Sequence, residues 1–382
     1  MVQINLYDAT SIQYLSFPDT PDGQYARDFL VPLMTQNPSY YIQNINTNLM
    51  ILKVNDVVLP ICINHKEYNN SYVCSPYTHY ISYAKQELSF LDSKFLRKSL
   101  SLLLSGLSPV FKLSKINKTI HVNNWFVSTN LYPNLTSEQL QAVREFLQTR
   151  YPKHAILFRS LNQTHHEDLY KAFIQQNFKL VGSRQVYILD LIKRPIKAKS
   201  RWLLKRDYKL LKQHQYEIVE ADQLSKKDIP RILELYNELY LGKYSKYNPQ
   251  YTEAFIELAL EKKLLHINAI KKNGRIDAVL GYFCRNGVMT TPLFGYDLSI
   301  PIETGLYRLL SVRLYHLVLE NGHSLNESSG AAQFKRNRGA VGEIEYTAVY
   351  DAHLPMYRRW IWSTLQSIIN RVGIPIMRKY KL

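Results

Sequence analysis

Two mostly apolar segments between Leu264 and Phe283 are separated by the polar residues 272–275, Lys-Asn-Gly-Arg. An Asn-Gly pair between apolar runs favours a two-residue β-turn, because both central residues must take positive φ. A second pair, Asn286-Gly287, leads directly into a third segment that ends near Asp297. The pattern therefore predicts a three-stranded antiparallel meander, with a bulge or the end of regular pairing at Pro292.

A long helix and two further strands are predicted after this meander. Apolar residues recur at helical spacing from Ile302 to Asn321, and Gly322 follows as a usual C-terminal stop. A short strand then ends at a polar tip near Glu327. A helix starting around Phe334 and a last strand at 343–350 complete the series.

The first half of the chain shows a similar order of elements. The expected elements are a hairpin (49–54 and 57–63), a helix (91–113), a strand (120–127), a helix from the capping box Thr136-Ser-Glu-Gln139, a strand (155–158), a helix (165–176) and a strand (178–191). Residues 64–90 have no clear period, so we expect a loop or an irregular strand, which is either a simple connection or the wall of a cleft. Both halves thus read as hairpin, helix, strand, helix, strand.

These patterns predict an α/β (α+β) fold with two domains in tandem. We place the N-terminal domain at 1–191, a basic linker at 192–199 and the C-terminal domain at 200–382. A basic helix, 202–212, opens the second domain, and an apolar helix, 353–372, lies near the end of the chain. Each domain is expected to hold a mixed, twisted sheet flanked by helices.

Charge is uneven along the 382 residues, whose formal net charge is +17. Residues 1–190 hold 17 Lys and Arg against 13 Asp and Glu, whereas residues 191–382 hold 31 against 18. The second half is therefore the one suited to an anionic partner, such as a donor phosphate, anionic lipid or nucleic acid. An apolar content of 46% argues against disorder.

Three cysteines without pairing or metal spacing indicate a reduced, cytoplasmic protein. The first residues lack a signal-peptide pattern, and no run of 18 apolar residues occurs. His165 and His166 would point about 100° apart on a helix, so we expect no metal site there. Walker, Rossmann, zinc-protease and serine-hydrolase motifs are also missing, which argues against those enzyme classes.

The segment Gly330-Ala-Ala-Gln-Phe-Lys-Arg-Asn-Arg-Gly339, after the short strand, resembles the second half of a GNAT acyltransferase. The closest resemblance is to tandem-domain types, the FemABX peptidyltransferases and the CelD/BcsL-like acetyltransferases. The predicted helix 165–176 and strand 178–191, joined through the sequence Asn177-Phe-Lys, resemble the last helix and strand of a first GNAT domain. This resemblance implies two tandem GNAT-like domains, with the active site in the second.

The resemblance also implies a set of site residues. Glu327 is the expected catalytic base, with Tyr346 as a second catalytic residue. The expected donor-binding residues are Gly305, Arg308, Lys335, Arg336 and Arg338. The expected substrate-binding residues are Tyr296, Asp297, Ser328, Ser329 and Gln333. The usual Gln/Arg-x-x-Gly-x-Gly/Ala loop of the family is absent before the long helix, where only Gly305 and Arg308 remain.

The implied function is transfer of an acyl group from acyl-CoA or an acyl-carrier protein to an amine of a small molecule, lipid precursor or envelope intermediate. One alternative is aminoacyl transfer from charged tRNA, as in FemABX proteins. A second is a non-catalytic module that binds nucleic acid or lipid. A third is an enzyme peripheral to the inner face of the membrane, held there by Trp360 and Trp362.

Overall fold

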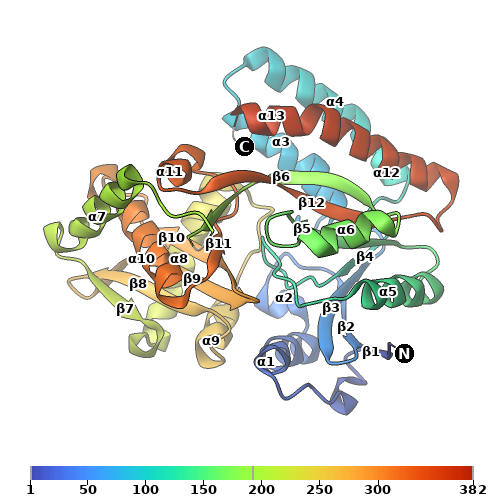
Figure 1. The fold of residues 1–382 in the computed structure, drawn as a ribbon, viewed down its shortest axis with the longest axis horizontal. Helices are drawn as coiled ribbons and strands as arrows, with labels where there is room; N and C mark the ends of the chain where they lie inside the picture. The colour runs from blue at the N-terminus through green and yellow to red at the C-terminus, as the bar shows by residue number, and fades with distance from the viewer. Residues whose placement is uncertain (1, 192, 381–382) are drawn as a thin grey trace. The chain divides into compact units, whose positions relative to one another are not determined.

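The computed structural model describes residues 2–191 and 193–380, which form two compact units (Figure 1). Unit 1 comprises Met1–Arg184, Tyr247–Gln250 and Ile344–Leu382. Unit 2 comprises Gln185–Lys246 and Tyr251–Glu343. The predicted duplicated α/β architecture is confirmed, since each unit has a mixed sheet with helices packed against it.

The unit boundaries differ from the predicted ones at 191 and 200. The chain leaves unit 1 inside strand β6 (Lys179–Asp190) and returns to it inside strand β12 (Val341–Tyr350). The return has a physical cause, because the end of β12 pairs with β5 (Ala155–Leu161) and the apolar side chains that follow it pack in unit 1. The predicted linker begins at residue 192, which lies outside the described residues, and helix α7 already starts at Ala198.

The sheet of unit 1 has the order β1-β2-β3-β4-β5-β12-β6. Its first strands are β1 (Ile4–Tyr7), β2 (Asn48–Val54), β3 (Val57–Asn64) and β4 (Thr119–Val122). These four pair antiparallel, whereas β4 and β5 run parallel, joined by helix α5 (Ser137–Arg150). The predicted capping box begins α5, with Thr136 and Gln139 bonded reciprocally.

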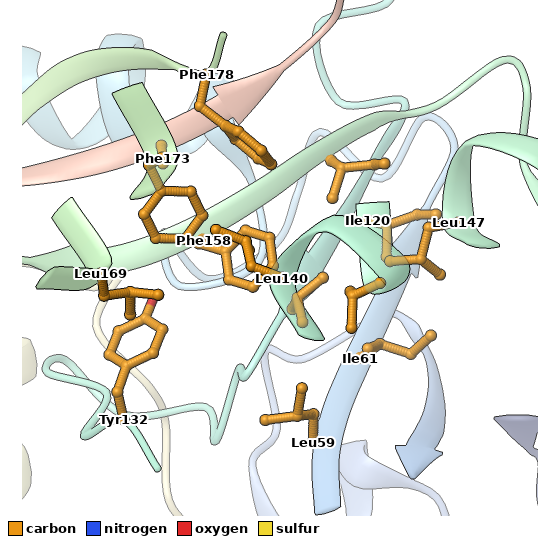
Figure 2. Packing of buried hydrophobic residues seen from close by; sticks show 14 of the residues in the cluster. Leu59, Ile61, Ile120, Tyr132, Leu140, Leu147, Phe158, Leu169, Phe173 and Phe178 are labelled. Carbon is orange, nitrogen blue, oxygen red and sulfur yellow. The ribbon is translucent and has the colours of Figure 1, made fainter. Parts of the chain in front are cut away.

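Helices cover both faces of this sheet. Side chains of α5 and α6 (Glu167–Gln175) pack on one face, where the rings of Phe158, Phe173 and Phe178 gather (Figure 2). The other face is covered by a π-helical segment (Thr78–Tyr83), α4 (Lys94–Leu113) and α12 (Met356–Ile368). The remaining helices of unit 1 are α1 (Pro21–Gln36), α2 (Pro38–Tyr41), α3 (Ala84–Glu87) and α13 (Ile374–Tyr380).

Unit 2 has a similar order of elements, except that β9 is followed directly by β10, and its sheet order is β6-β11-β10-β9-β8-β7. Its strands are β7 (Glu217–Glu220), β8 (His266–Lys272), β9 (Arg275–Arg285), β10 (Val288–Tyr296) and β11 (Ser324–Asn326). Its helices are α7 (Ala198–Gln213), α8 (Ile229–Asn237), α9 (Glu253–Glu261), α10 (Leu306–Asn321) and α11 (Ala332–Asn337). The predicted meander is confirmed, and both Asn-Gly turns have positive φ at both residues.

The parallel crossover recurs in unit 2, where β10 and β11 are parallel and α10 joins them. Apolar residues of α7 and α10 pack together in one core cluster with this sheet. Helix α8 lies so close to β10 that a Cβ at Gly295 would stand 2.5 Å from the carbonyl of Leu235. Only glycine allows this approach of helix and strand backbones.

Two predictions about unit 1 are wrong. Residues 78–90 are helical rather than a loop, because successive π, α and 3₁₀ turns carry no single apolar period. The strand predicted over 120–127 ends at Val122, since Asn123 and Phe126 have positive φ and cannot continue a strand. Beyond that point Trp125 donates through Nε1 to Oδ1 of Asn123, at 2.7 Å.

Candidate functional site

The parallel pair β10 and β11 stays together for only three residue pairs. Val288, Met289 and Thr290 face Ser324, Leu325 and Asn326, and the pairing then ends. The register of β10 against β9 shifts between Thr290 and Leu293, which confirms the predicted irregularity at Pro292. Strand β10 continues to Tyr296 without β11, so Glu327 is the first residue beyond the paired end of β11.

Glu327 is a buried carboxyl group at this strand end. Its side-chain Oε1 accepts a 2.9 Å hydrogen bond from the hydroxyl of Tyr315, which is fully buried on α10. Burial raises the pKa of Glu327 to about 7, although the charges of Lys335 and Arg338 and the Tyr315 hydrogen bond oppose the rise. A carboxylate with a pKa near neutrality is suited to taking up a proton during a reaction.

Lys335 holds the loop that follows Glu327. Its Nζ donates to the backbone carbonyls of Glu327 and Ser329, at 2.7 and 2.9 Å, and to that of Ser328 at 3.4 Å. The loop takes positive φ at Ser328, Gly330 and Ala331, so it turns sharply over the lysine. The structure thus brings Glu327, Ser328, Ser329 and Lys335 together, with the ammonium group directed inward at the loop backbone.

The other two cations of the predicted cluster have different surroundings. Arg338 is buried and donates through Nε and Nη2 to Oδ2 of Asp207 on α7, with the Nε bond at 2.9 Å. Its guanidinium carbon also lies 3.5 Å from the centre of the Phe334 ring. Arg336 is exposed on the same short helix, as is Gln333, whose side-chain amide donates to Asn337. An anionic ligand would therefore meet Arg336 rather than Arg338.

Aromatic side chains surround Tyr307 near the beginning of α10. Its ring lies 4.8 Å from that of Phe334, 5.6 Å from that of Phe294 and 6.1 Å from that of Tyr296. Burial, and then the charge of Glu327, raise the pKa of Tyr307 well above its ordinary value. Its phenol therefore stays protonated in neutral solution and lies within electrostatic range of Glu327.

Gly305 begins α10 with a φ of +75°, which is a left-handed conformation. Neighbouring Arg308 folds back, and its Nη2 donates to the carbonyl of Glu303 at 2.8 Å. A Cβ at Gly305 would lie 2.7 Å from this guanidinium group. The start of α10 therefore combines the free N–H groups of a helix end with a partly exposed arginine, which suits an anion.

Asp297, predicted to bind substrate, is nearly enclosed by other groups. Its Oδ2 accepts hydrogen bonds from Arg231 and Arg275, at 2.5 and 2.6 Å, and its Oδ1 accepts from Ser299. Burial opposes ionisation of Asp297, but the hydrogen bonds from Ser299 and Arg231 outweigh it and lower the pKa. Tyr296, which precedes Asp297, lies beside the Tyr307 ring instead.

Tyr346 belongs to unit 1, whereas Glu327 belongs to unit 2. The Tyr346 ring lies edge-on to that of Tyr170, at 5.8 Å, and packs on the apolar core beneath α5 and α6. A catalytic role for Tyr346 stays a prediction.

Tyr315 and Asp207, the partners of two predicted site residues, were not predicted from the sequence. Tyr315 stands among the apolar residues of α10, so it resembles a core residue in the sequence. Asp207 is the single acid of the basic helix 202–212, and this isolation is the one signal that could have marked it. Their contacts with Glu327 and Arg338 join residues that lie 12 and 131 positions apart.

No family model and no curated protein matches the chain. Among solved structures, it is similar to L-PGS from Bacillus licheniformis, at 18% identity over 60% of this chain and 76% of that one, with a TM-score of 0.42. It is similar to FemX, at 8% identity over 59% and 80%, with a TM-score of 0.46. It is also similar to a tandem GNAT protein from the clavulanic acid biosynthesis pathway, at 8% identity over 91% and 98%, with a TM-score of 0.37.

Proposed function

We propose that the chain is an acyltransferase with Glu327 as its general base. The observation that most directly supports this proposal is a buried carboxyl group with a pKa of about 7, at the point where the parallel strands β10 and β11 separate. Two strands that separate leave backbone groups without a strand partner, and an extended acyl donor can pair with them. The pyrophosphate of acyl-CoA, or the phosphate of a carrier-protein arm, would lie at the start of α10.

The donor site in this proposal uses Gly305, Arg308 and Arg336. Helix α10 is 16 residues long, and its first N–H groups and macrodipole favour a phosphate. Gly305 is buried in a left-handed conformation at this end, while Arg308 lies one turn further along the helix. Lys335 and Arg338 act indirectly in this scheme, because they hold the loop and helix that carry Glu327 and Arg336.

The chemical step in this proposal is attack of an acceptor amine on the thioester carbonyl. Glu327 accepts the proton that the amine nitrogen loses as the new amide bond forms, and the carbon–sulfur bond breaks to release a thiolate. The departing thiolate takes a proton from Tyr307 or from water. Because the carboxylate of Glu327 is the active form, the rate should rise with pH through about 7.

Aminoacyl transfer from charged tRNA is the second candidate, favoured by the excess of 31 Lys and Arg over 18 Asp and Glu in residues 191–382. Binding of tRNA would weaken steeply with added salt, because phosphate contacts release counterions. Binding of acyl-CoA at one helix end would depend on salt much less. The predicted substrate-binding residues Ser328, Ser329 and Gln333 would meet the acceptor in both reactions.

A thermal-shift screen of acyl-CoAs, acyl-carrier proteins and tRNA tests the proposal. Stabilisation by one donor class identifies the donor, since a ligand that binds only the folded state raises the melting temperature. Turnover with that donor and a panel of amines should then fall by at least about 100-fold in Glu327→Gln, with the donor-induced shift unchanged. Full turnover in Glu327→Gln would exclude Glu327 as the base, and the lack of any donor shift would favour a non-catalytic module.

A further inference from the structure

Helix α4 in unit 1 has two apolar faces. The inner face carries Leu96, Leu100, Leu104, Leu107 and Phe111, at helical spacing, and packs toward the body of unit 1. The outer face carries Phe95, Leu102, Gly106, Pro109 and Leu113, which lie on the opposite side of the helix, with Lys98 and Ser99 between the first two. A surface helix normally has one such stripe, so the outer face needs a separate explanation.

The outer apolar face is exposed to an unusual degree. The exposed fraction is 83% for Phe95, 75% for Leu102 and 79% for Leu113. Leu103 and Val110, at the edge of this face, are also exposed. Apolar residues exposed singly are common, but several on one helix face mark an interaction surface.

The polar side of α4 carries positive charges only. Lys94, Arg97, Lys98 and Lys112 alternate there with serines, and residues 94–113 contain no Asp or Glu. An exposed apolar stripe beside a strip of Lys and Arg is the pattern of a helix that lies in the plane of an anionic membrane surface. Two copies of this chain would instead bring like charges together at α4.

Two hollows lie beside this helix. One is an apolar cavity of about 140 Å³ between the inner leucines of α4 and residues of α13, including Ile376 and Met377. The other is a shallow basic hollow lined by Lys85, Lys94, Arg97 and Lys98. Leu88 lines both of them, so an apolar site and a cationic site adjoin. An anionic lipid has the matching pair of an acyl chain and a phosphate.

The tryptophan pair predicted to contact a membrane does not form such a surface. Trp362 is only 1% exposed and belongs to the core, and Arg358 is buried with its guanidinium bonded to backbone carbonyls. Trp360 alone of the two tryptophans is exposed. In the part of the chain that the structure describes, no helix is both long and apolar enough to cross a bilayer.

We propose that α4 docks unit 1 on an anionic lipid bilayer, with its outer apolar face inserted among the acyl chains and its cations against lipid phosphates. This membrane contact is independent of the reaction proposed for Glu327. The proposed occupant is a bilayer surface, because every charged residue of α4 is positive and its most exposed apolar side chains lie on one face.

Co-sedimentation with vesicles tests this proposal. The full chain is mixed with phosphatidylcholine vesicles that contain either about 30% of the anionic lipid phosphatidylglycerol or none. We expect binding to the anionic vesicles that is at least about tenfold stronger than to the neutral ones and that falls with added salt. The variant Phe95→Ser/Leu102→Ser/Leu113→Ser should lose at least about tenfold in binding.

Two further variants test whether the cations of α4 select anionic vesicles and whether an exposed aromatic ring elsewhere contributes to binding. The variant Lys94→Gln/Arg97→Gln/Lys98→Gln should lose the preference for anionic vesicles, while Tyr14→Ser, which removes an aromatic ring 77% exposed elsewhere in unit 1, should bind like the wild type. Circular dichroism and melting curves establish that each variant is folded. Failure of the wild type to bind, or unchanged binding of the Phe95/Leu102/Leu113 variant, overturns the proposal. If the wild type is a dimer and the Phe95/Leu102/Leu113 variant is a monomer, the proposal is also overturned, because the outer face of α4 then binds a second copy of the chain.

Discussion

The hydroxyl of Tyr315 donates a 2.9 Å hydrogen bond to Oε1 of Glu327 in the interior of unit 2. This contact joins the middle of α10 to the loop after β11, and it favours the ionised form of a carboxyl group that burial otherwise keeps protonated. The Tyr315 hydrogen bond and burial therefore act in opposite directions on the pH at which Glu327 becomes a base.

Tyr315→Phe should move the pH–rate profile to higher pH. Without its hydrogen bond, the Glu327 pKa rises further above about 7, by about one pH unit for a hydrogen bond to a charged group. The measurement is kcat/KM against pH for wild type and variant. Tyr208→Phe, on the exposed side of α7, is the matched control. An unchanged midpoint in Tyr315→Phe would show that Glu327 does not control the rate.

Glu327→Gln should stabilise the protein above pH 7. The pKa of Glu327 in the folded protein, about 7, lies above the ordinary value of 4.5. The stability that protonated Glu327 contributes is therefore present below pH 4.5 and is lost as pH rises through 7. Glutamine stays neutral throughout. The gain in unfolding free energy should grow from near zero at pH 4.5 to about 3 kcal/mol at pH 8. Urea denaturation at both pH values measures it, and a pH-independent difference would contradict the raised pKa.

Arg338→Ala should destabilise the protein by about 3 kcal/mol, because it removes both hydrogen bonds that Arg338 donates to Oδ2 of the buried Asp207 carboxylate. The control is Arg336→Ala, on the helix that ends just before Arg338, and its stability should change by less than about 0.5 kcal/mol. Chemical denaturation measures both. Donor affinity should fall in Arg336→Ala, and equal stability losses in the two variants would contradict this division of roles.

Gly305→Ala and Gly322→Ala should each cost about 1 to 2 kcal/mol, because both glycines have positive φ. Only the Gly305 methyl group would meet another group within 4 Å, the Arg308 guanidinium, whereas Gly322 has open space. Donor binding, measured by calorimetry, should therefore weaken in Gly305→Ala and not in Gly322→Ala. Equal donor affinities would place the donor phosphate away from the start of α10.

The elements that could be predicted from sequence are those with a local cause. The Asn273-Gly274 and Asn286-Gly287 turns, the Thr136 capping box and the Gly322 helix stop all formed as expected. Each depends on backbone preferences within a few residues, so the amino-acid pattern is sufficient. Glu327 follows the short strand Ser324–Asn326, as predicted.

Tertiary structure alone decided what surrounds those residues. The sequence by itself determined that Lys335 and Arg336 lie on a short helix with Arg338 close after them, but folding directed Lys335 to the loop carbonyls, Arg338 to Asp207 and Arg336 to the surface. Folding also returned the last strand and helices to unit 1. Burial and partners distant in sequence set these outcomes, because a charge removed from water must find its counterpart wherever the packed chain places one.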